Sequence, residues 1–414
     1  MISTSWRPRG GLAVLVVGVT LLAACGSTSS PGSTVPATSS DTAGSEIVIG
    51  TIGTYSGPAA SSVAPGLATL KAWNKDLNEK GGINGHKVRL VVKDDGGNAT
   101  AALQAAKDLV STEKVVAIVG DASLNDTTWA DFISKSSVPV VGGSPQNVPF
   151  ATNPDFFTVG TNYVAQSYGK LEQAKQAGPK VGSLFCAEAP VCAAISAVYN
   201  AIAPTLGLTV PVSQKVLAAA PNFTGQCVAL KDAGVQSYIA DVGTATAVSV
   251  VDQCHDLGVT ARPIGSAGVI TSDWLSHPGA QGARDIELAF PFFDASTPAS
   301  AAYQAMLKKH NLGDGGGASA TYTYLAGKLF EKAVAAAGPG QVTAASVRRG
   351  LYALKGETLG GLTSPLTYTE GKPTLINCWF VVGIENKAFT TPQGLKPSCA
   401  PDEAVKKVLV QTLN

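Results

Sequence analysis

The chain has no excess of charge of either sign and few histidines, and both shortages exclude classes of function. Its 30 lysines and arginines stand against 29 aspartates and glutamates, so the composition offers nothing to attract nucleic acid or an anionic membrane surface. The four histidines, His86, His255, His277 and His310, are scattered, and the sequence contains no GxSxG or HExxH pattern. We therefore expect no nucleic-acid partner and no enzymatic activity.

The first 45 residues have the pattern of an exported lipoprotein. Arg7 and Arg9 precede an apolar run that ends at Ala24, which is too short for a mature membrane helix and is typical of a secretory signal. The run leads into Leu22-Ala23-Ala24-Cys25-Gly26, which resembles a bacterial lipobox; an ordinary signal peptide with a chance cysteine is the alternative. We expect a signal peptide over residues 1–25, lipidation of Cys25, and a disordered tether over residues 26–45.

Six further cysteines form an even set, which predicts disulfides in an exported chain. Their positions along the sequence favour the pairs Cys186–Cys192, Cys227–Cys254 and Cys378–Cys399, although the sequence by itself leaves other pairings open. A zinc site from Cys227, Cys254 and His255 is the alternative, but paired CxxC or HxxxH spacing is missing. We expect no metal and no cofactor.

Residues 46–120 predict a parallel βαβαβ unit. Apolar residues at spacings of three and four give its first helix one stripe that faces a sheet: Val63, Leu67, Leu70, Trp73 and Leu77. Gly81 suits the positive φ found past a helix end, and Asn98 or Thr100 can cap the second helix. Strands are expected at 88–92 and, as a fully apolar run, at 115–119. Such units require right-handed crossovers and a doubly wound sheet.

The second half of the chain repeats this architecture. Strands are predicted at 181–185, 237–241, 262–265 and 286–290, with helices at 193–203 and 245–257. Three more helical stretches follow, at 299–310, 318–337 and 343–354, and we expect them to return to the first lobe. About 390 residues remain after the signal, more than a single core usually holds, so two lobes are expected.

Several segments of the mature chain occur in an order and spacing typical of one family. They are Ile49-Gly50 with Tyr55-Ser56-Gly57-Pro58-Ala59, Gly81–Gly85, Asp94-Asp95, Val119-Gly120, Val138-Pro139-Val140 and Gly361–Leu366. Together they resemble a type I periplasmic solute-binding protein of the branched-chain amino-acid (Leu/Ile/Val) ABC transporter family.

The resemblance implies an α/β fold of two doubly wound, Rossmann-like lobes joined by a three-strand hinge, a clamshell that closes on its ligand. The strands should cross near Gly160, Phe290 and Gly361. The N-terminal lobe would then comprise residues 46–160 plus 290–360, and the C-terminal lobe residues 161–289 plus 361–414.

Ligands of open α/β sheets bind beyond the carboxyl ends of the strands, where helix N-termini favour a carboxylate. Three loops of the first lobe meet this description, and by analogy they would hold a ligand carboxylate; their candidates are Tyr55, Ser56, Ser123, Asn125, Ser144 and Gln146. Each hydroxyl can equally cap a helix or stabilise a turn. Asp121 would repel a carboxylate, so either it points away or the ligand carries a positive or neutral donor group.

The candidates in the second lobe are Tyr163, Glu188, Thr244 and Ala267. Here the resemblance implies a tyrosine after the strand at 181–185 and an aromatic residue after the strand at 237–241. It also implies a glutamate after 262–265 that meets the ligand's α-ammonium group. This chain has Ala267 at the glutamate position. An ammonium group buried without a partner costs several kcal/mol, so recognition of a free amino acid requires Glu188, Asp241 or Asp121 as a substitute.

The resemblance therefore predicts a lipid-anchored substrate-binding protein of an ABC importer on the outer face of the cytoplasmic membrane. It would act as a monomer, capture a branched-chain amino acid or a related carboxylate or amide by hinge closure, and dock on the permease subunits. A ligand-sensing receptor lipoprotein without a transport role is the alternative. The sequence names neither the ligand nor the cognate permease.

Overall fold

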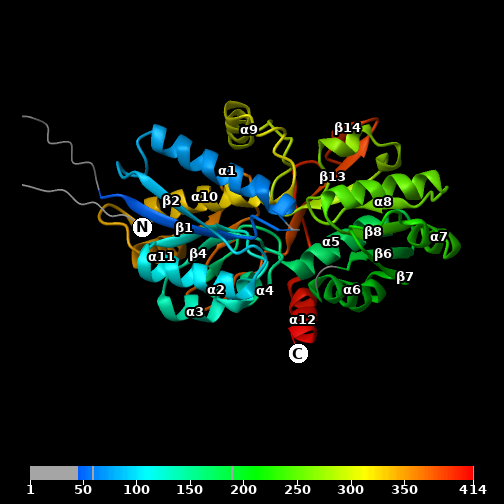
Figure 1. Ribbon diagram of the computed structural model, residues 1–414, viewed down its shortest axis with the longest axis horizontal. Helices are drawn as coiled ribbons and strands as arrows, with labels where there is room; N and C mark the ends of the chain where they lie inside the picture. The colour runs from blue at the N-terminus through cyan, green and yellow to red at the C-terminus, as the bar shows by residue number, and fades with distance from the viewer. Residues whose placement is uncertain (1–44, 58–59, 188–189, 414) are drawn as a thin grey trace, which may run out of the picture. The chain divides into compact units, whose positions relative to one another are not determined.

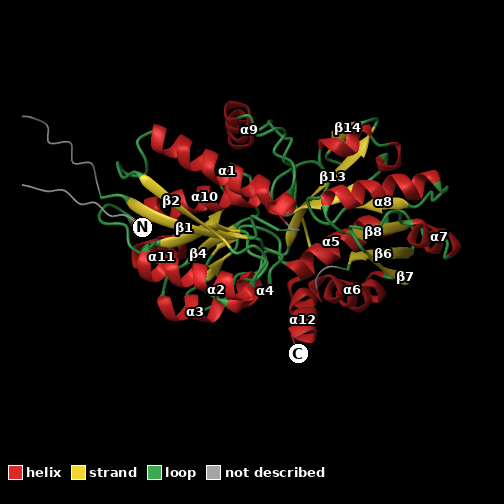
Figure 2. Cartoon of the chain, viewed as in Figure 1, coloured by secondary structure: helices red, strands yellow, loops and turns green. Residues whose placement is uncertain are grey.

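A computed structural model of the protein describes residues 45–57, 60–187 and 190–413. The predicted signal peptide, Cys25, almost all of the tether and Glu188 lie outside these residues. Within them, five strands form a parallel sheet in the order β2-β1-β3-β4-β5, and a second, larger sheet runs β14-β13-β10-β9-β8-β6-β7 (Figures 1 and 2).

The strands of the first sheet are β1 Ile47–Gly53, β2 Val88–Asp94, β3 Ala117–Asp121, β4 Val140–Gly143 and β5 Phe156–Phe157. Helices α1 (Ala60–Glu79) and α10 (Ala318–Ala337) pack together on one face. Helices α2 (Ala99–Lys107) and α3 (Ala130–Ser136) cover the other face, and a short α4 (Val148–Thr152) follows β4 (Figure 1). The sheet is therefore doubly wound, as predicted.

Helix α1 buries the predicted stripe. Val63, Leu70, Trp73 and Leu77 are buried, and Leu67 is half-buried. The Trp73 ring lies so close to α10 that a Cβ on Gly327 would approach it to 2.5 Å, so this crossing requires a glycine. The helix-end predictions are also confirmed: Gly81 has a φ of 101°, and the Asn98 side chain accepts the amide protons of Thr100 and Ala101.

Two strands differ from the prediction at one end: β3 begins later, and β10 ends earlier. Strand β3 begins at Ala117, later than predicted, because the Val115 amide donates to the carbonyl of Leu109 in the preceding π-helical turn Asp108–Thr112. Strand β10 ends at Glu287, not at Phe290, because the next carbonyl, that of Leu288, accepts the amide proton of Thr161 at 3.2 Å. In both cases a backbone group near the strand end is bonded outside the strand ladder.

The strands of the second sheet are β6 Lys180–Cys186, β7 Thr209–Val216, β8 Ser237–Asp241, β9 Arg262–Ile264, β10 Arg284–Glu287, β13 Cys378–Glu385, β14 Ala388–Thr390 and β15 Ser398–Cys399. Strands β6 to β10 are parallel to one another, and β13 runs antiparallel to β10. Helices α5 (Tyr163–Lys175), α6 (Pro190–Ile202) and α12 (Asp402–Leu413) pack together on one face. Helices α7 (Thr224–Asp232) and α8 (Thr244–Asp256) lie on the other (Figure 1).

The remaining elements come late in the chain, and their helices pack against α1 or α10. They are α9 Pro298–His310, α10, α11 Ala344–Ala353, and the strand pair β11 Lys355–Glu357 and β12 Leu366–Thr367. Helix α10 contacts β3 and β4, as expected for a return to the first lobe. Thr363 donates to the Val159 carbonyl at 2.8 Å, and the Asn162 amide donates to Ile376 at 3.0 Å. The lobe boundaries themselves stay a prediction.

Two of the predicted disulfides, Cys227–Cys254 and Cys378–Cys399, are present. The first joins α7 to α8, so the alternative zinc site at Cys227, Cys254 and His255 is wrong. Cys186 is also disulfide-bonded. The side chain of Cys192 lies outside the described part, so that pairing stays a prediction. Within the described ranges, no helix combines the length and apolar character needed to cross a membrane.

Candidate functional site

The three predicted loops of the first lobe follow β1, β3 and β4 at their carboxyl ends, so the topology brings them to one edge of the sheet. Direct contacts join them. The Leu124 amide donates to the Thr54 hydroxyl at 3.2 Å, and the Ser144 amide donates to the Asp121 carbonyl at 2.9 Å. The sequence therefore located this edge correctly, whereas the directions of its side chains come only from the structure.

The two serines predicted to hold a ligand have partners inside the protein. The Ser123 hydroxyl donates to Asp95 at 2.5 Å and accepts the Asn125 amide proton at 3.0 Å. Ser144 is 3% exposed, and its side chain hydrogen-bonds to that of Tyr322 on α10. Both hydroxyls thus stabilise the loops, and their ligand role stays a prediction.

The other first-lobe candidates differ in exposure. Tyr55 is half-buried with its phenol 3.0 Å from the Thr51 hydroxyl, and burial raises the pKa of this phenol. Ser56 and Gln146 are exposed. Asn125 is half-buried, yet its Nδ2 atom is buried and has no hydrogen-bond partner among the described residues.

Four aspartates, Asp94, Asp95, Asp121 and Asp126, lie at this edge, and each accepts at least one hydrogen bond from the protein. Asp94 accepts the amide protons of Tyr55, Ser56 and Gly96. Asp95 accepts the hydroxyl protons of Thr54 and Ser123 and the Gly97 amide proton. The amide protons of Tyr55 and Ser56 are therefore already bound to a carboxylate of the protein itself, a feature that the sequence analysis missed.

Asp121 is the most buried of the four, with no exposed surface. Its Oδ1 atom accepts the Ser123 amide proton at 3.1 Å, whereas Oδ2 is buried without a hydrogen-bond partner in the described structure. Burial, and next the nearby charge of Asp126, raise the pKa of Asp121 well above its usual range. Burial also raises the pKa of Asp126, to about 7.

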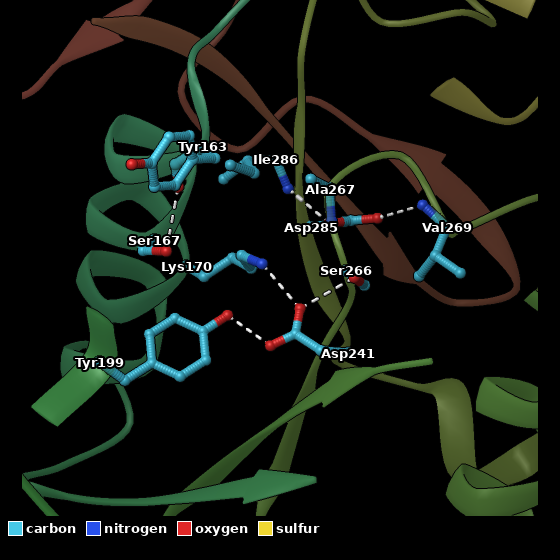
Figure 3. A network of polar contacts seen from close by, with 10 residues as sticks. All are labelled: Tyr163, Ser167, Lys170, Tyr199, Asp241, Ser266, Ala267, Val269, Asp285 and Ile286. Atoms are coloured by element: carbon cyan, nitrogen blue, oxygen red, sulfur yellow. Dashed lines mark hydrogen bonds and ion pairs between the residues drawn. The ribbon is translucent and has the colours of Figure 1, made fainter. Parts of the chain in front are cut away.

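In the second lobe, a buried ion pair lies at the carboxyl end of β8 (Figure 3). Lys170 of α5 donates to Asp241 Oδ1 at 2.7 Å, and Ser266 donates to the same oxygen at 2.8 Å. The Tyr199 hydroxyl donates to Oδ2 at 2.5 Å. Asp241 was one of the three proposed substitutes for the missing glutamate, but its charge is already compensated inside the protein.

A second carboxylate, Asp285, lies beneath the loop that contains Ala267. The amides of Ala267 and Ile286 donate to Oδ1, and that of Val269 donates to Oδ2 (Figure 3). The Ile270 amide also donates to Oδ2. A Cβ on Gly265 would approach the Asp285 carboxyl carbon to 2.5 Å, so only glycine fits at position 265. Asp285 therefore fixes this loop, and no pattern in the sequence indicated that it would.

Glu287, two residues further along β10, is also buried. It is 1% exposed, and neither of its carboxylate oxygens has a hydrogen-bond partner among the described residues. Burial first, and then the charge of Asp285, raise the pKa of Glu287 well above its usual range. Unlike Asp121, it lies within a strand, where its backbone pairs with Phe380.

The remaining second-lobe candidates differ in exposure. Tyr163 and Thr244 begin α5 and α8 and are half-buried, whereas Ala267 is 7% exposed with a φ of 56°. Trp129 and Trp274 are completely buried and belong to the core.

Two surface cavities lie on the first lobe, of about 430 Å³ beside Asn84 and Pro339 and about 320 Å³ beside Thr127 and Pro149. Their lining residues include none of the predicted ligand residues. The cavities therefore do not alter the assignment of the loops.

Comparison with known proteins identifies the family. Residues 46–388 match the family described as "Periplasmic binding protein", and the chain belongs to it. The fold is similar to that of a branched-chain amino-acid ABC transporter protein from Thermus thermophilus with bound valine, with a TM-score of 0.77 at 18% identity over 88% of this chain and 98% of that one. It is also similar to a fatty-acid ABC transporter substrate-binding protein from Thermomonospora curvata, with a TM-score of 0.73 at 16% identity over 87% and 94% of the two chains.

At the level of sequence, the chain is 24% identical over 243 residues to an amino acid binding protein of Pseudomonas aeruginosa. The match covers 56% of this chain and 64% of that relative, less than two thirds of its length. The type I periplasmic binding protein fold is thereby established, and the relatives are solute-binding proteins.

Proposed function

We propose that this protein is the substrate-binding component of an ABC importer and captures a small polar metabolite between its two lobes. The observation that carries the proposal is the family match over residues 46–388, joined to a topology that brings the loops after β1, β3 and β4 to one edge. The ligand class is a branched-chain amino acid or a related carboxylate or amide, and the function involves no catalysis.

The protein acts as a monomer outside the cytoplasmic membrane, anchored through lipid on Cys25, and delivers its ligand to the permease subunits. Two acyl chains anchor a protein stably where one is marginal. Replacement of Cys25 by alanine should therefore release the protein from the membrane fraction.

The ligand is best sought by thermal unfolding of the full-length protein against amino acids, short carboxylates and amides. A ligand present at about a hundred times its dissociation constant adds roughly 2.7 kcal/mol to the free energy of unfolding, a shift of several degrees. If no compound of these classes shifts the midpoint, the proposed ligand class is wrong. Uptake of a radiolabelled hit by cells with and without the protein then separates transport from sensing.

The site assignment requires a variant that blocks the loops without disturbing the fold. Ser144 is unsuitable, because a large residue at this buried position would displace Tyr322. Gln146 is exposed in the same turn, so Gln146→Trp should keep the unfolding midpoint and weaken binding. Lys114→Trp, at an exposed turn remote in sequence from the three loops, is the control.

A further inference from the structure

The disulfides Cys227–Cys254 and Cys378–Cys399 differ in their exposure to solvent. Cys227 and Cys254, which join α7 to α8, are both 0% exposed. In the other pair, Cys378 is half-buried and Cys399 is exposed. A disulfide is reduced by direct attack of a thiolate on one of its sulfur atoms, so the reaction requires access to that atom. A reductant can therefore reach the second pair at Cys399, whereas the first pair is protected.

The exposed disulfide holds a very short strand in place. Strand β15 consists of Ser398 and Cys399, which pair with Trp379 and Cys378 of β13. Residues 392–396, which precede it, are all exposed. Strands of globular proteins are usually longer than two residues, and so short a ladder contributes little by itself. The disulfide thus supplies an attachment that these backbone contacts cannot replace.

Strand β15 covers the part of β13 that precedes the ladder with β10. Strand β10 pairs with β13 at residues 380–383, whereas Cys378 and Trp379 pair with β15. The Ala400 amide adds one further bond, to the Asn377 carbonyl at 2.9 Å. The beginning of β13 therefore depends on β15, and so on the disulfide, for these backbone contacts.

The same part of the chain meets the crossing expected near Gly160. The Thr161 hydroxyl donates to the Cys378 carbonyl at 2.5 Å, and the Asn162 amide donates to the Ile376 carbonyl at 3.0 Å. Thr161 and Asn162 are 0% and 3% exposed, so their polar groups depend on partners within the protein. Cys378 thus connects an exposed disulfide with a buried crossing segment.

We propose that Cys378–Cys399 is a redox-sensitive switch. Its reduction by a dithiol releases β15 and loosens the contacts that Thr161 and Asn162 make with the beginning of β13. The inference goes beyond the proposed function, because it holds for any ligand that the protein binds. The buried pair Cys227–Cys254 stays oxidised under the same conditions.

The reduction takes place in two exchange steps. One thiolate of the dithiol attacks Sγ of Cys399, which forms a mixed disulfide and expels Cys378 as a thiolate. The second thiolate of the reagent then attacks the reagent's own sulfur in the mixed disulfide and expels Cys399. The dithiol supplies both electrons and ends as a cyclic disulfide, while the two protein thiolates take up the two protons that the dithiol lost.

Selective reduction is the first measurement. Full-length protein is incubated in native buffer with increasing concentrations of dithiothreitol, and the new thiols are alkylated. Peptide mapping assigns each label, so that Cys186 is read separately. We expect labelling of Cys378 and Cys399 at dithiothreitol concentrations at least about a hundredfold lower than those that label Cys227 and Cys254.

Hydrogen exchange, read by mass spectrometry, then reports the effect on the crossing. Peptides that contain Thr161, Asn162 or Ala400 should exchange at least about tenfold faster in the reduced protein, because their amide protons lose protection when this region opens locally. Peptides from β8 should exchange as before. Reoxidation with oxidised glutathione should restore the slow exchange, as a switch requires.

The double variant Cys378→Ala/Cys399→Ala is the control for other effects of the reductant. Because it lacks the disulfide permanently, it should exchange fast at Thr161 and Asn162 without dithiothreitol and should not change further when dithiothreitol is added. If this variant fails to fold, the reversible reduction of the wild type still decides the question.

Two results would overturn the inference. Reduction of both disulfides at the same dithiothreitol concentration, or of Cys227–Cys254 first, would contradict the selective access assigned to Cys399. Selective reduction that leaves the exchange at Thr161 and Asn162 unchanged would show that the pair is a fixed crosslink and not a switch. Neither result bears on the importer function, which the ligand and uptake measurements test separately.

Discussion

Lys170 on α5 and Asp241 at the end of β8 form a buried ion pair at 2.7 Å, with side chains that are 4% and 2% exposed. The Lys170 ammonium group also lies 5.4 Å from the centre of the Tyr199 ring. The pair therefore connects three elements of the second lobe beneath the loops predicted to bind ligand.

Removal of one partner of this pair should be far more damaging than removal of both charges. Lys170→Met leaves Asp241 buried without its cation, so we expect the free energy of unfolding to fall by about 3–5 kcal/mol in urea denaturation. The double variant Lys170→Met/Asp241→Asn should recover most of this loss. A single variant that loses less than about 1 kcal/mol would show that the pair does not stabilise the fold.

Asp285 should make the protein less stable as pH rises through its titration. Burial raises its pKa to about 6 against its four backbone hydrogen bonds, so the folded protein holds this proton more tightly than the unfolded chain does. The stabilising contribution is thus complete below the unfolded pKa of 3.8 and is lost as the pH rises through about 6, by roughly 3 kcal/mol. The difference between the unfolding free energies of the wild type and Asp285→Asn, measured from pH 3.5 to 7, should show this slope.

The contribution of Asp94 to stability should depend on pH in the opposite direction to that of Asp285. Burial acts to raise its pKa, but hydrogen bonds from Gly96, Ser56 and Tyr55 outweigh it and lower the pKa below 3.8. The contribution of Asp94 is therefore present above the unfolded pKa and lost as the pH falls through the lower folded value. Equal slopes for Asp94→Asn and Asp285→Asn would contradict both assignments.

Asn162 should contribute more to the free energy of unfolding than an ordinary helix cap does. Its Oδ1 atom caps α5 through the Ala165 amide, while Nδ2 donates to the Ile376 carbonyl at 2.8 Å and to Asn377 at 2.6 Å. Asn162→Ala leaves these buried groups unpaired, and we expect a loss of about 3 kcal/mol.

The exposed cap Asn98 of α2 is the control for Asn162. Its side chain accepts only the amide protons of Thr100 and Ala101, so Asn98→Ala should cost about 1 kcal/mol. Urea denaturation of both variants measures the difference. Similar losses would mean that the contacts of Asn162 with residues 376 and 377 contribute nothing to stability.

The element order and the buried faces could be predicted because they depend on residues close in sequence. The α1 stripe, the Asn98 cap and the positive φ of Gly81 each follow from a side chain and its neighbours within one or two turns. The pairings Cys227–Cys254 and Cys378–Cys399 were also predicted, since each joins elements that the alternation of strands and helices makes neighbours.

By itself, then, the sequence determined the two doubly wound sheets and the edge at which the loops gather, through local propensity and apolar periodicity. Only the tertiary structure decided which polar groups at that edge are already paired. Lys170 and Asp241 are 71 residues apart, and Ser123 reaches Asp95 across 28, so no local pattern records either contact. Partners of this kind are selected when separate strands bring their ends together and every buried polar atom competes for the few donors within reach.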